Sequence, residues 1–135
     1  MIIKGEHKRT IWVDKDNKNL IQTFDQRLFP HEVKIVDITT SSDAGIAIKD
    51  MIVRGAPLIG AMAAYGIYLA AVEHNGPNLI NYLNERKDYL NETRPTAINL
   101  AWALNEQFKN ITGLVEKDAI TKALLDGANK IVEDD

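Results

Sequence analysis

Two short stretches of this sequence each place an arginine close before a proline: Arg-Gly-Ala-Pro at 54–57 and Arg-Pro at 94–95. Proline suits the start of a helix, because its missing N–H would be unpaired there and its φ is already helical. The free N–H groups of a helix start carry partial positive charge, and a neighbouring guanidinium completes a setting that suits phosphate or carboxylate. Two such starts side by side would form a phosphate cradle. The alternative is two capped helices with surface arginines.

The composition bounds what kind of protein could carry such a site. The 135 residues correspond to one domain or to part of a longer protein, and 45% hydrophobic with 26% charged residues is ordinary for a globular chain. The net charge of -3, with acidic and basic residues mixed, argues against nucleic acid or an anionic membrane as partner. There is no cysteine, which excludes disulfides, thiolate metal sites and a cysteine nucleophile in this chain. This fits a reducing cytosol, so we expect a cytoplasmic protein.

Neither a signal peptide nor a membrane span is expected. The N-terminus has no apolar signal core. The longest uncharged run, Gly55–Val72, is shorter than the ~20 residues that a membrane helix needs. It is rich in alanine and glycine, which indicates a helix buried in the core of the protein.

The first third of the chain predicts β structure. Thr10–Val13 and Asn19–Phe24 flank a polar turn and should form a hairpin with a long loop. Pro30 favours an extended approach to Val33–Ile38, which alternates as a third strand does. Three strands with one apolar face are stable if a helix covers them.

The next stretch predicts the first helix. Thr39–Ser42 supplies several N-cap residues, and the helix should end near Val53, at the arginine-glycine turn. Behind the caps, apolar side chains recur at helical spacing at Ala44, Ala47, Ile48, Met51 and Ile52.

The second helix should start at Pro57 and is apolar on all sides, so we expect it to be buried on all sides. Gly60 and Gly66 each cost about 1 kcal/mol of helix propensity against alanine. Close packing of neighbouring helices is the natural compensation. Gly76 is a plausible C-terminal glycine for this helix.

Three further helices follow. Pro77 is expected to open the third, which stops at 91–94; Pro95 opens the fourth; and the last begins near Glu116. The predicted fold class is therefore α+β and mostly helical: a small three-stranded antiparallel sheet over about residues 10–38, then about five packed helices over about 42–133.

Other polar and aromatic residues carry weaker signals. His31 could be a polar site residue, although a histidine in such a segment more often pins a loop. No cluster of histidine, aspartate and glutamate has metal-ligand spacing, so no metal is expected. His7 and His74 fit surface positions, Asp25, Asp37 and Asp50 fit turns or helix ends, and Trp12, Trp102, Tyr65 and Phe108 fit the core or an interface.

Several motifs resemble one enzyme family, the methylthioribose-1-phosphate isomerases. These are Arg-Gly-Ala-Pro-Leu-Ile-Gly at 54–60 with Ala-Ala-Tyr-Gly at 63–66, and Arg-Pro-Thr-Ala-Ile-Asn-Leu at 94–100. Shorter matches are Thr-Ile-Trp at 10–12, Asp-Gln at 25–26, Pro-His-Glu at 30–32 and Asp-Met-Ile-Val-Arg at 50–54. The resemblance covers essentially the whole chain, with one departure at Leu58, where these isomerases usually have alanine. The superfamily also contains ribose-1,5-bisphosphate isomerases and the alpha, beta and delta subunits of translation initiation factor 2B.

The resemblance implies a fold, a reaction and a set of site residues. The fold is a helical N-terminal domain with a small β element, joined to a C-terminal Rossmann-like domain. The reaction converts an aldose phosphate to a ketose phosphate by an open-chain route without a cofactor, in methionine salvage. The residues implied to hold the substrate phosphate are Arg54, Gly55, Ala56 and Arg94.

The chain departs from the family in length and in lacking a cysteine. The resemblance places the catalytic cysteine and aspartate in the C-terminal domain, so no catalytic residue is expected here. We therefore interpret residues 1–135, with a β-rich segment at 1–38 and a helical segment at 39–135, as the N-terminal half of such an isomerase, inactive alone for want of proton-transfer groups. Its expected partners are a sugar phosphate, a C-terminal half and a second copy in a homo-oligomer such as a dimer. The alternative is a non-catalytic protein-interaction domain like those of initiation factor 2B, and a new role for a short stable chain is a third possibility.

Overall fold

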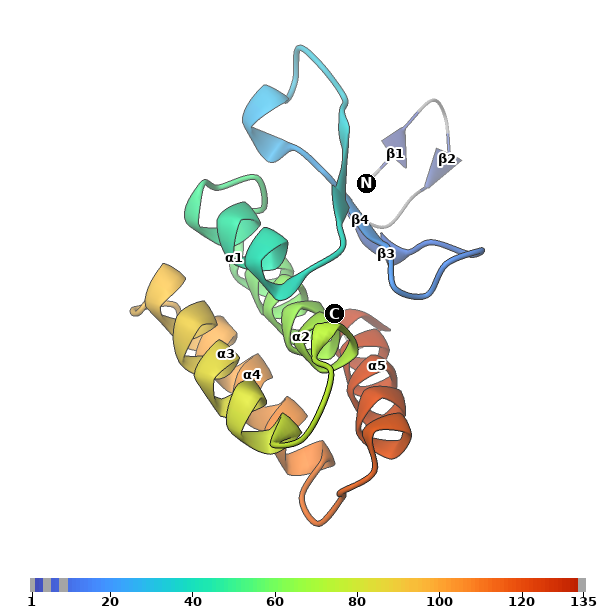
Figure 1. Cartoon of the computed structure of the whole chain (residues 1–135). Coiled ribbons are helices and arrows are strands. Elements are labelled where there is room, and N and C mark those ends of the chain that lie inside the picture. Colours follow the sequence, from blue (N-terminus) through green and yellow to red (C-terminus); the bar gives the residue numbers. More distant parts are fainter. Residues whose placement is uncertain (1, 4–5, 8–9, 134–135) are drawn as a thin grey trace.

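The computed structural model describes residues 2–3, 6–7 and 10–133 and has a small β region at one end of a helical bundle (Figure 1). The predicted fold class is confirmed: a three-stranded antiparallel sheet precedes five helices. The strands are β1 (Ile2–Ile3), β2 (Glu6–His7), β3 (Ile11–Val13), β4 (Ile21–Phe24) and β5 (Ile35–Ile38), with a 3-10 turn, η1 (Gln26–Leu28). The helices are α1 (Ser41–Lys49), α2 (Ala56–Glu73), α3 (Leu79–Thr93), α4 (Ile98–Asn110) and α5 (Lys117–Glu133).

The sheet contains the predicted hairpin, β3 with β4, and the third strand β5 pairs with β4, so the order is β3-β4-β5. Ile11 pairs with Thr23 and Ile21 pairs with Ile38, and Ile21 and Thr23 are two residues apart on β4, so all four side chains lie on one face of the sheet. Ile11, Ile21 and Ile38 are at most 3% exposed, because α1 and α2 cover this face. The short β1–β2 pair is a feature that the sequence pattern did not predict.

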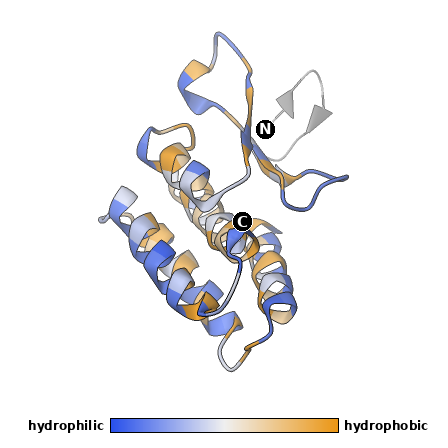
Figure 2. Cartoon of the chain, viewed as in Figure 1, coloured by the Kyte–Doolittle hydropathy of each residue, from blue (hydrophilic) through white to orange (hydrophobic). Residues whose placement is uncertain are grey.

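Helix α2 is the centre of the helical half. It contacts all four other helices, and in Figure 2 it is white and orange while its neighbours carry blue on their outer sides. Among the described residues it is the helix long and apolar enough to cross a membrane by length and composition, but 72% of it is buried inside the fold. The prediction of a helix buried on all sides is confirmed by its fully buried residues: Met62, Ala63, Ala64, Ile67, Leu69, Ala70 and Ala71.

The two glycines of α2 sit where neighbouring elements come closest, as predicted. A Cβ on Gly66 would lie 3.0 Å from the Ala44 Cβ of α1 and 3.2 Å from a Leu90 methyl of α3. A Cβ on Gly60 would lie 3.2 Å from the backbone oxygen of Asn99, in the first turn of α4. Glycine therefore allows α1, α3 and α4 to approach α2 closely, and the resulting dispersion attraction between the helices offsets the low helix propensity of glycine.

A buried glutamine joins three helices. Gln107 of α4 is fully buried, and its Nε2 donates to the Ala64 oxygen of α2 at 3.0 Å and to the Leu124 oxygen of α5 at 2.8 Å. Gly127 leaves room for it, since a Cβ there would lie 2.2 Å from the Gln107 Oε1. Buried polar groups with partners in this way fix the relative position of helices.

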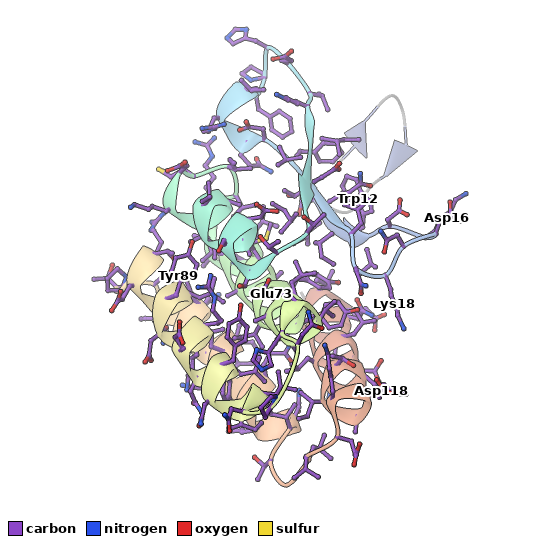
Figure 3. The ribbon with its side chains drawn as sticks, in the orientation of Figure 1. Trp12, Asp16, Lys18, Glu73, Tyr89 and Asp118 are labelled. Atoms are coloured by element: carbon purple, nitrogen blue, oxygen red, sulfur yellow. The ribbon has the colours of Figure 1, made fainter. Side chains whose placement is uncertain are left out.

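A second polar network closes the end of α2 that lies away from Arg54. The Glu73 carboxylate accepts from the Ser41 N–H at 2.8 Å and from the Ser41 hydroxyl at 2.7 Å, and also from the Tyr82 hydroxyl (Glu73 is labelled in Figure 3). Burial, reinforced by Glu73, raises the pKa of Tyr82. Arg86 donates to the hydroxyls of Ser41 and Ser42, at 2.9 Å each. The start of α1 is thereby pinned to α2 and α3.

The end of α1 and the start of α3 differ from the prediction. Helix α1 ends at Lys49 rather than near Val53, because Met51 turns into the left-handed region with φ 62°. Helix α3 begins at Leu79 rather than at Pro77, after Asn78 at φ 65°. Gly76 has φ 100° but lies in the loop beyond the C-cap residue of α2.

The start of α4 is the correction that bears on the site. Pro95 does not open this helix: α4 begins at Ile98, with Ala97 as its N-cap. The segment 94–96 forms a turn instead, in which the Ala97 N–H donates to the Arg94 oxygen at 3.0 Å. Arg94 has φ −147° and ψ 76°, in keeping with the bias of a residue before proline away from the helical region.

Candidate functional site

The turn between α1 and α2 presents the first candidate residues. Gly55 is the N-cap of α2 with φ 93° and ψ 134°, a conformation that suits glycine, and Pro57 lies in the first turn as predicted. Arg54, Gly55 and Ala56 are all exposed, whereas Val53 before them is fully buried. The buried Val53 thus anchors the turn on its N-terminal side, and the turn is open to solvent at Arg54.

The N-terminus of α2 has no side-chain cap, because Gly55 has no side chain to supply one. The Ile59 N–H donates to the Gly55 oxygen at 3.0 Å, which leaves the N–H groups ahead of it as unpaired donors of the first turn. The N-cap of α4, Ala97, likewise makes no side-chain capping bond. By contrast, α1 is capped by Thr40, whose hydroxyl accepts from the Asp43 N–H at 3.0 Å. Both helix starts of the predicted cradle therefore keep donors for an anion.

The structure brings these two helix starts together. Gly60 in the second turn of α2 lies against the backbone of Asn99 in the first turn of α4, as the 3.2 Å approach shows. Figure 1 shows the α1–α2 turn and the α3–α4 turn toward the same end of the bundle. Residues 54–56 and Arg94, some forty positions apart in the chain, thus belong to neighbouring turns. The positive ends of two helix dipoles face this region.

Arg54 and Arg94 differ from the other described arginines in having no partner. Within residues 10–133, Arg27 pairs with Asp25, and Arg86 bonds two serines and lies 4.1 Å over the Tyr89 ring. Arg54 and Arg94 make no side-chain hydrogen bond or ion pair with any residue that the structure describes. Arg54 is exposed and Arg94 is half-buried. Two guanidinium groups with free donors, at two uncapped helix starts, can bind a phosphate.

An ion pair next to this turn was not anticipated. Asp25 was predicted to be a turn residue, and it does cap η1, but its carboxylate is also buried. It accepts from the Arg27 Nε at 2.9 Å and Nη2 at 2.7 Å. These bonds lower the pKa of Asp25 below its ordinary value, so the carboxylate is ionised at neutral pH. The spacing of an aspartate two residues before an arginine was the available signal.

The exposed apolar residues near the start of α4 are a second unexpected feature. Ile98 is 82% exposed and Trp102, one turn later on the same face, is 51% exposed. Trp102 is therefore not a core residue in this chain, and its predicted interface role stays a prediction. Tyr65 is buried, and Trp12 and Phe108 are half-buried.

The remaining candidates lie apart from this constellation or are ordinary surface groups. His31 is exposed in a turn after Pro30. The His74 ring stacks on Tyr82, with centroids 4.7 Å apart, at the opposite end of α2. No group of three or more potential metal-binding side chains occurs among the described residues.

Comparison with known proteins gives a family match and close relatives. The family model described as "Initiation factor 2 subunit family" matches residues 52–135. A methylthioribose-1-phosphate isomerase from Sinorhizobium medicae is 41% identical over 135 residues, which is 100% of this chain and 36% of that protein. A 5-deoxyribose 1-phosphate isomerase from Clostridium botulinum is 41% identical over 125 residues, which is 89% of this chain and 36% of that protein.

Two solved structures share the fold. The 5-methylthioribose 1-phosphate isomerase of Pyrococcus horikoshii superposes with a TM-score of 0.87 at 32% identity, over 96% of this chain and 37% of that one. The delta subunit of translation initiation factor eIF-2B from A. fulgidus gives 0.86 at 30% identity, over 96% of this chain and 38% of that one. The chain thus spans little more than a third of the length of the proteins it matches.

Proposed function

This chain belongs to the initiation factor 2 subunit family, and from that premise we propose that it is the substrate-phosphate-binding part of an aldose–ketose sugar-phosphate isomerase. The observation that supports this most is the pair of unpartnered arginines, Arg54 and Arg94, at the adjacent uncapped starts of α2 and α4. Such a site supplies charge and backbone donors to one dianion.

The names of the relatives favour a 1-phosphorylated aldose as ligand. Methylthioribose 1-phosphate and 5-deoxyribose 1-phosphate differ at the C5 substituent and share the phosphate. In this proposal the helix-start N–H groups and the guanidinium groups of Arg54 and Arg94 hold that common phosphate. In the same proposal, the group at C5 and the reacting carbons are left to the remaining length of the isomerase relatives, of which this chain matches about a third.

Isomerisation of an aldose to a ketose moves a proton between neighbouring carbons, which requires positioned acid and base groups. The Arg54 and Arg94 turns offer cations and amide donors, which bind and orient the phosphate but do not take a proton from carbon. We therefore propose that the chain binds the sugar phosphate without converting it, and that turnover needs the remaining length present in the isomerase relatives. The site would act in the cytoplasm, where sugar phosphates occur.

The first test is a titration of the chain with methylthioribose 1-phosphate, followed by backbone-amide NMR. We expect a dissociation constant on the order of 1 mM, since one end of the ligand is held. Shifts should concentrate at residues 54–59 and 94–100. The same sugar without phosphate should cause none of them, and no ketose phosphate should form. Absence of any shift at these two segments would refute the proposed function.

The main alternative is a protein-interaction domain without chemistry, as the similarity to the eIF-2B delta subunit suggests. The observation in its favour is the exposed pair Ile98 and Trp102 on α4. It predicts protein binding and no response to sugar phosphate. The coding sequence after Asp135 also separates the two: a Rossmann-like continuation with one cysteine and an aspartate favours the isomerase.

We further propose that the Ile98–Trp102 face makes the isolated chain self-associate, because a large exposed apolar pair in a small protein favours burial against a second copy. Sedimentation at tens of micromolar should detect a species heavier than a monomer. Replacing Ile98 and Trp102 together by glutamate should return it to a monomer. The control is Val115→Glu, which changes an isolated valine that is 83% exposed and should leave association unchanged. A monomeric unmodified chain would contradict this proposal.

A further inference from the structure

The loop after β4 touches the Arg54 turn through its backbone. The Gln26 N–H donates to the Ile52 oxygen at 2.8 Å. Ile52 stands two residues before Arg54 and directly after Met51, whose φ of 62° is unfavourable for a residue with a side chain. This hydrogen bond therefore joins the turn directly beside Met51, the residue of the turn with the unfavourable backbone conformation.

Asp25 and Arg27 flank Gln26 and hold it in this position. The Asp25 carboxylate accepts from the Arg27 N–H at 3.0 Å, and from the Arg27 Nε and Nη2 as a bidentate pair. The Asp25 N–H donates to the Lys34 oxygen at 2.9 Å, which closes the loop. The two residues beside Gln26 are thus bonded to each other, and the first of them is also bonded to the strand side of the loop.

Arg27 is not placed to serve as a third phosphate ligand. Its guanidinium is occupied by Asp25, and the charge of Asp50, at the end of α1, lies close enough to favour its protonated form further. The ion pair with Asp25 therefore leaves little net positive charge on Arg27 for an anion. Burying a carboxylate costs free energy unless it is paired, which is a reason to expect that the Asp25–Arg27 pair has a role.

We propose that Asp25 and Arg27 are positioning residues for the phosphate site, which hold the Gln26 N–H against the Ile52 oxygen and so keep the Met51–Gly55 turn in its binding conformation. This inference rests on the proposed function. It assigns to the β region a role in ligand affinity: the loop of the sheet sets the geometry of a turn that belongs to the helical half.

The test is the titration of the full chain with methylthioribose 1-phosphate, monitored by amide NMR, for a set of variants. We expect Arg27→Met to weaken binding about tenfold, because the Arg54 turn is then held less firmly in its binding conformation. Amide exchange at Gln26 should accelerate, because the loop that holds its N–H against the Ile52 oxygen is weakened. Arg27→Lys keeps the charge, is less disruptive to folding and should give an intermediate loss.

Lys34→Met is the matched control, since Lys34 is an exposed cation of the same loop whose side chain acts on the Asp25 carboxylate only through its charge, without a hydrogen bond, and the substitution keeps the Lys34 backbone oxygen. It should change affinity less than about twofold. The decisive variant is Met51→Gly in the Arg27→Met background. Glycine accepts a positive φ readily, so it should restore much of the lost affinity if Arg27 acts through the turn.

The outcomes separate this role from the proposed function. Suppose that the unmodified chain binds, and that Arg27→Met and Arg27→Lys both bind as tightly as it does. The positioning role is then overturned and the proposed function stands. If Arg27→Met weakens binding and the loss is not rescued by Met51→Gly, Arg27 acts on the ligand by contact or by its charge and the positioning role is wrong. If the unmodified chain does not bind, the proposed function fails and the positioning role fails with it.

Discussion

Replacing both Arg54 and Arg94 by alanine is expected to weaken binding of methylthioribose 1-phosphate by about 100-fold, because each guanidinium supplies charge-assisted hydrogen bonds worth about 1.5–3 kcal/mol. Neither arginine has a side-chain partner among the described residues, and Arg54 is exposed. The fold should therefore tolerate the loss. Each single variant is expected to lose about tenfold.

The measurement is the amide NMR titration of the double variant beside Lys122→Ala. Lys122 pairs with Asp126 on the surface of α5, so its removal also takes away positive charge but outside the two candidate turns. The control should bind as the unmodified chain does, and the thermal midpoints of all variants should agree within a few degrees. An undiminished affinity of the double variant would exclude these arginines as phosphate ligands.

Replacing Gly66 by leucine is expected to destabilise the chain by about 3 kcal/mol or more, because overpacking a close helix contact forces the backbones apart. The position has no spare room: a Cβ would already lie 3.0 Å from Ala44 and 3.2 Å from Leu90. The added branched side chain would have to displace α1 or α3 from α2. For a domain of this size such a loss is a large part of the total stability.

Urea denaturation followed by circular dichroism measures this effect as a shift of the unfolding midpoint. The control is Ala119→Leu, at an exposed position of α5, which should change the stability by less than about 0.5 kcal/mol. A Gly66→Leu variant as stable as the unmodified chain would mean that the α1–α2–α3 contact is not close packed in solution.

The sequence predicted the type and order of the three-stranded sheet and the five helices because their signals are local. The all-apolar character of α2 follows from burial on every face. In 33–38 the β-branched residues indicated a strand, although only Val36 and Ile38 face the core and Val33 and Ile35 are half exposed. The helix boundaries were harder to predict from the sequence. Proline was taken as the first helical residue in three places, yet only Pro57 lies in a first turn. Proline fixes its own φ, but the neighbouring turn decides where the helix hydrogen bonds begin.

The candidate site, too, could be predicted from the sequence only in part. The arginine-proline stretches identified Arg54 and Arg94 from residue types and spacing alone. Their lack of partners became visible only in the fold, because Arg27 and Arg86 have the same side chain and are bound by Asp25 and by Ser41. A sequence pattern cannot distinguish a paired guanidinium from a free one, since the partner of Arg86 is 45 residues away.

By itself, the sequence determined the fold class, the central place of α2 and the two arginines that could bind an anion, since these depend on hydrophobic periodicity and residue chemistry. The tertiary structure decided that Gly60 lets α4 pack against α2, so that two distant turns become neighbours. It also decided that the loop after β4 bonds to the oxygen of Ile52. The physical reason is that close approach and hydrogen-bond pairing between distant segments arise from packing of the whole chain, which no local pattern records.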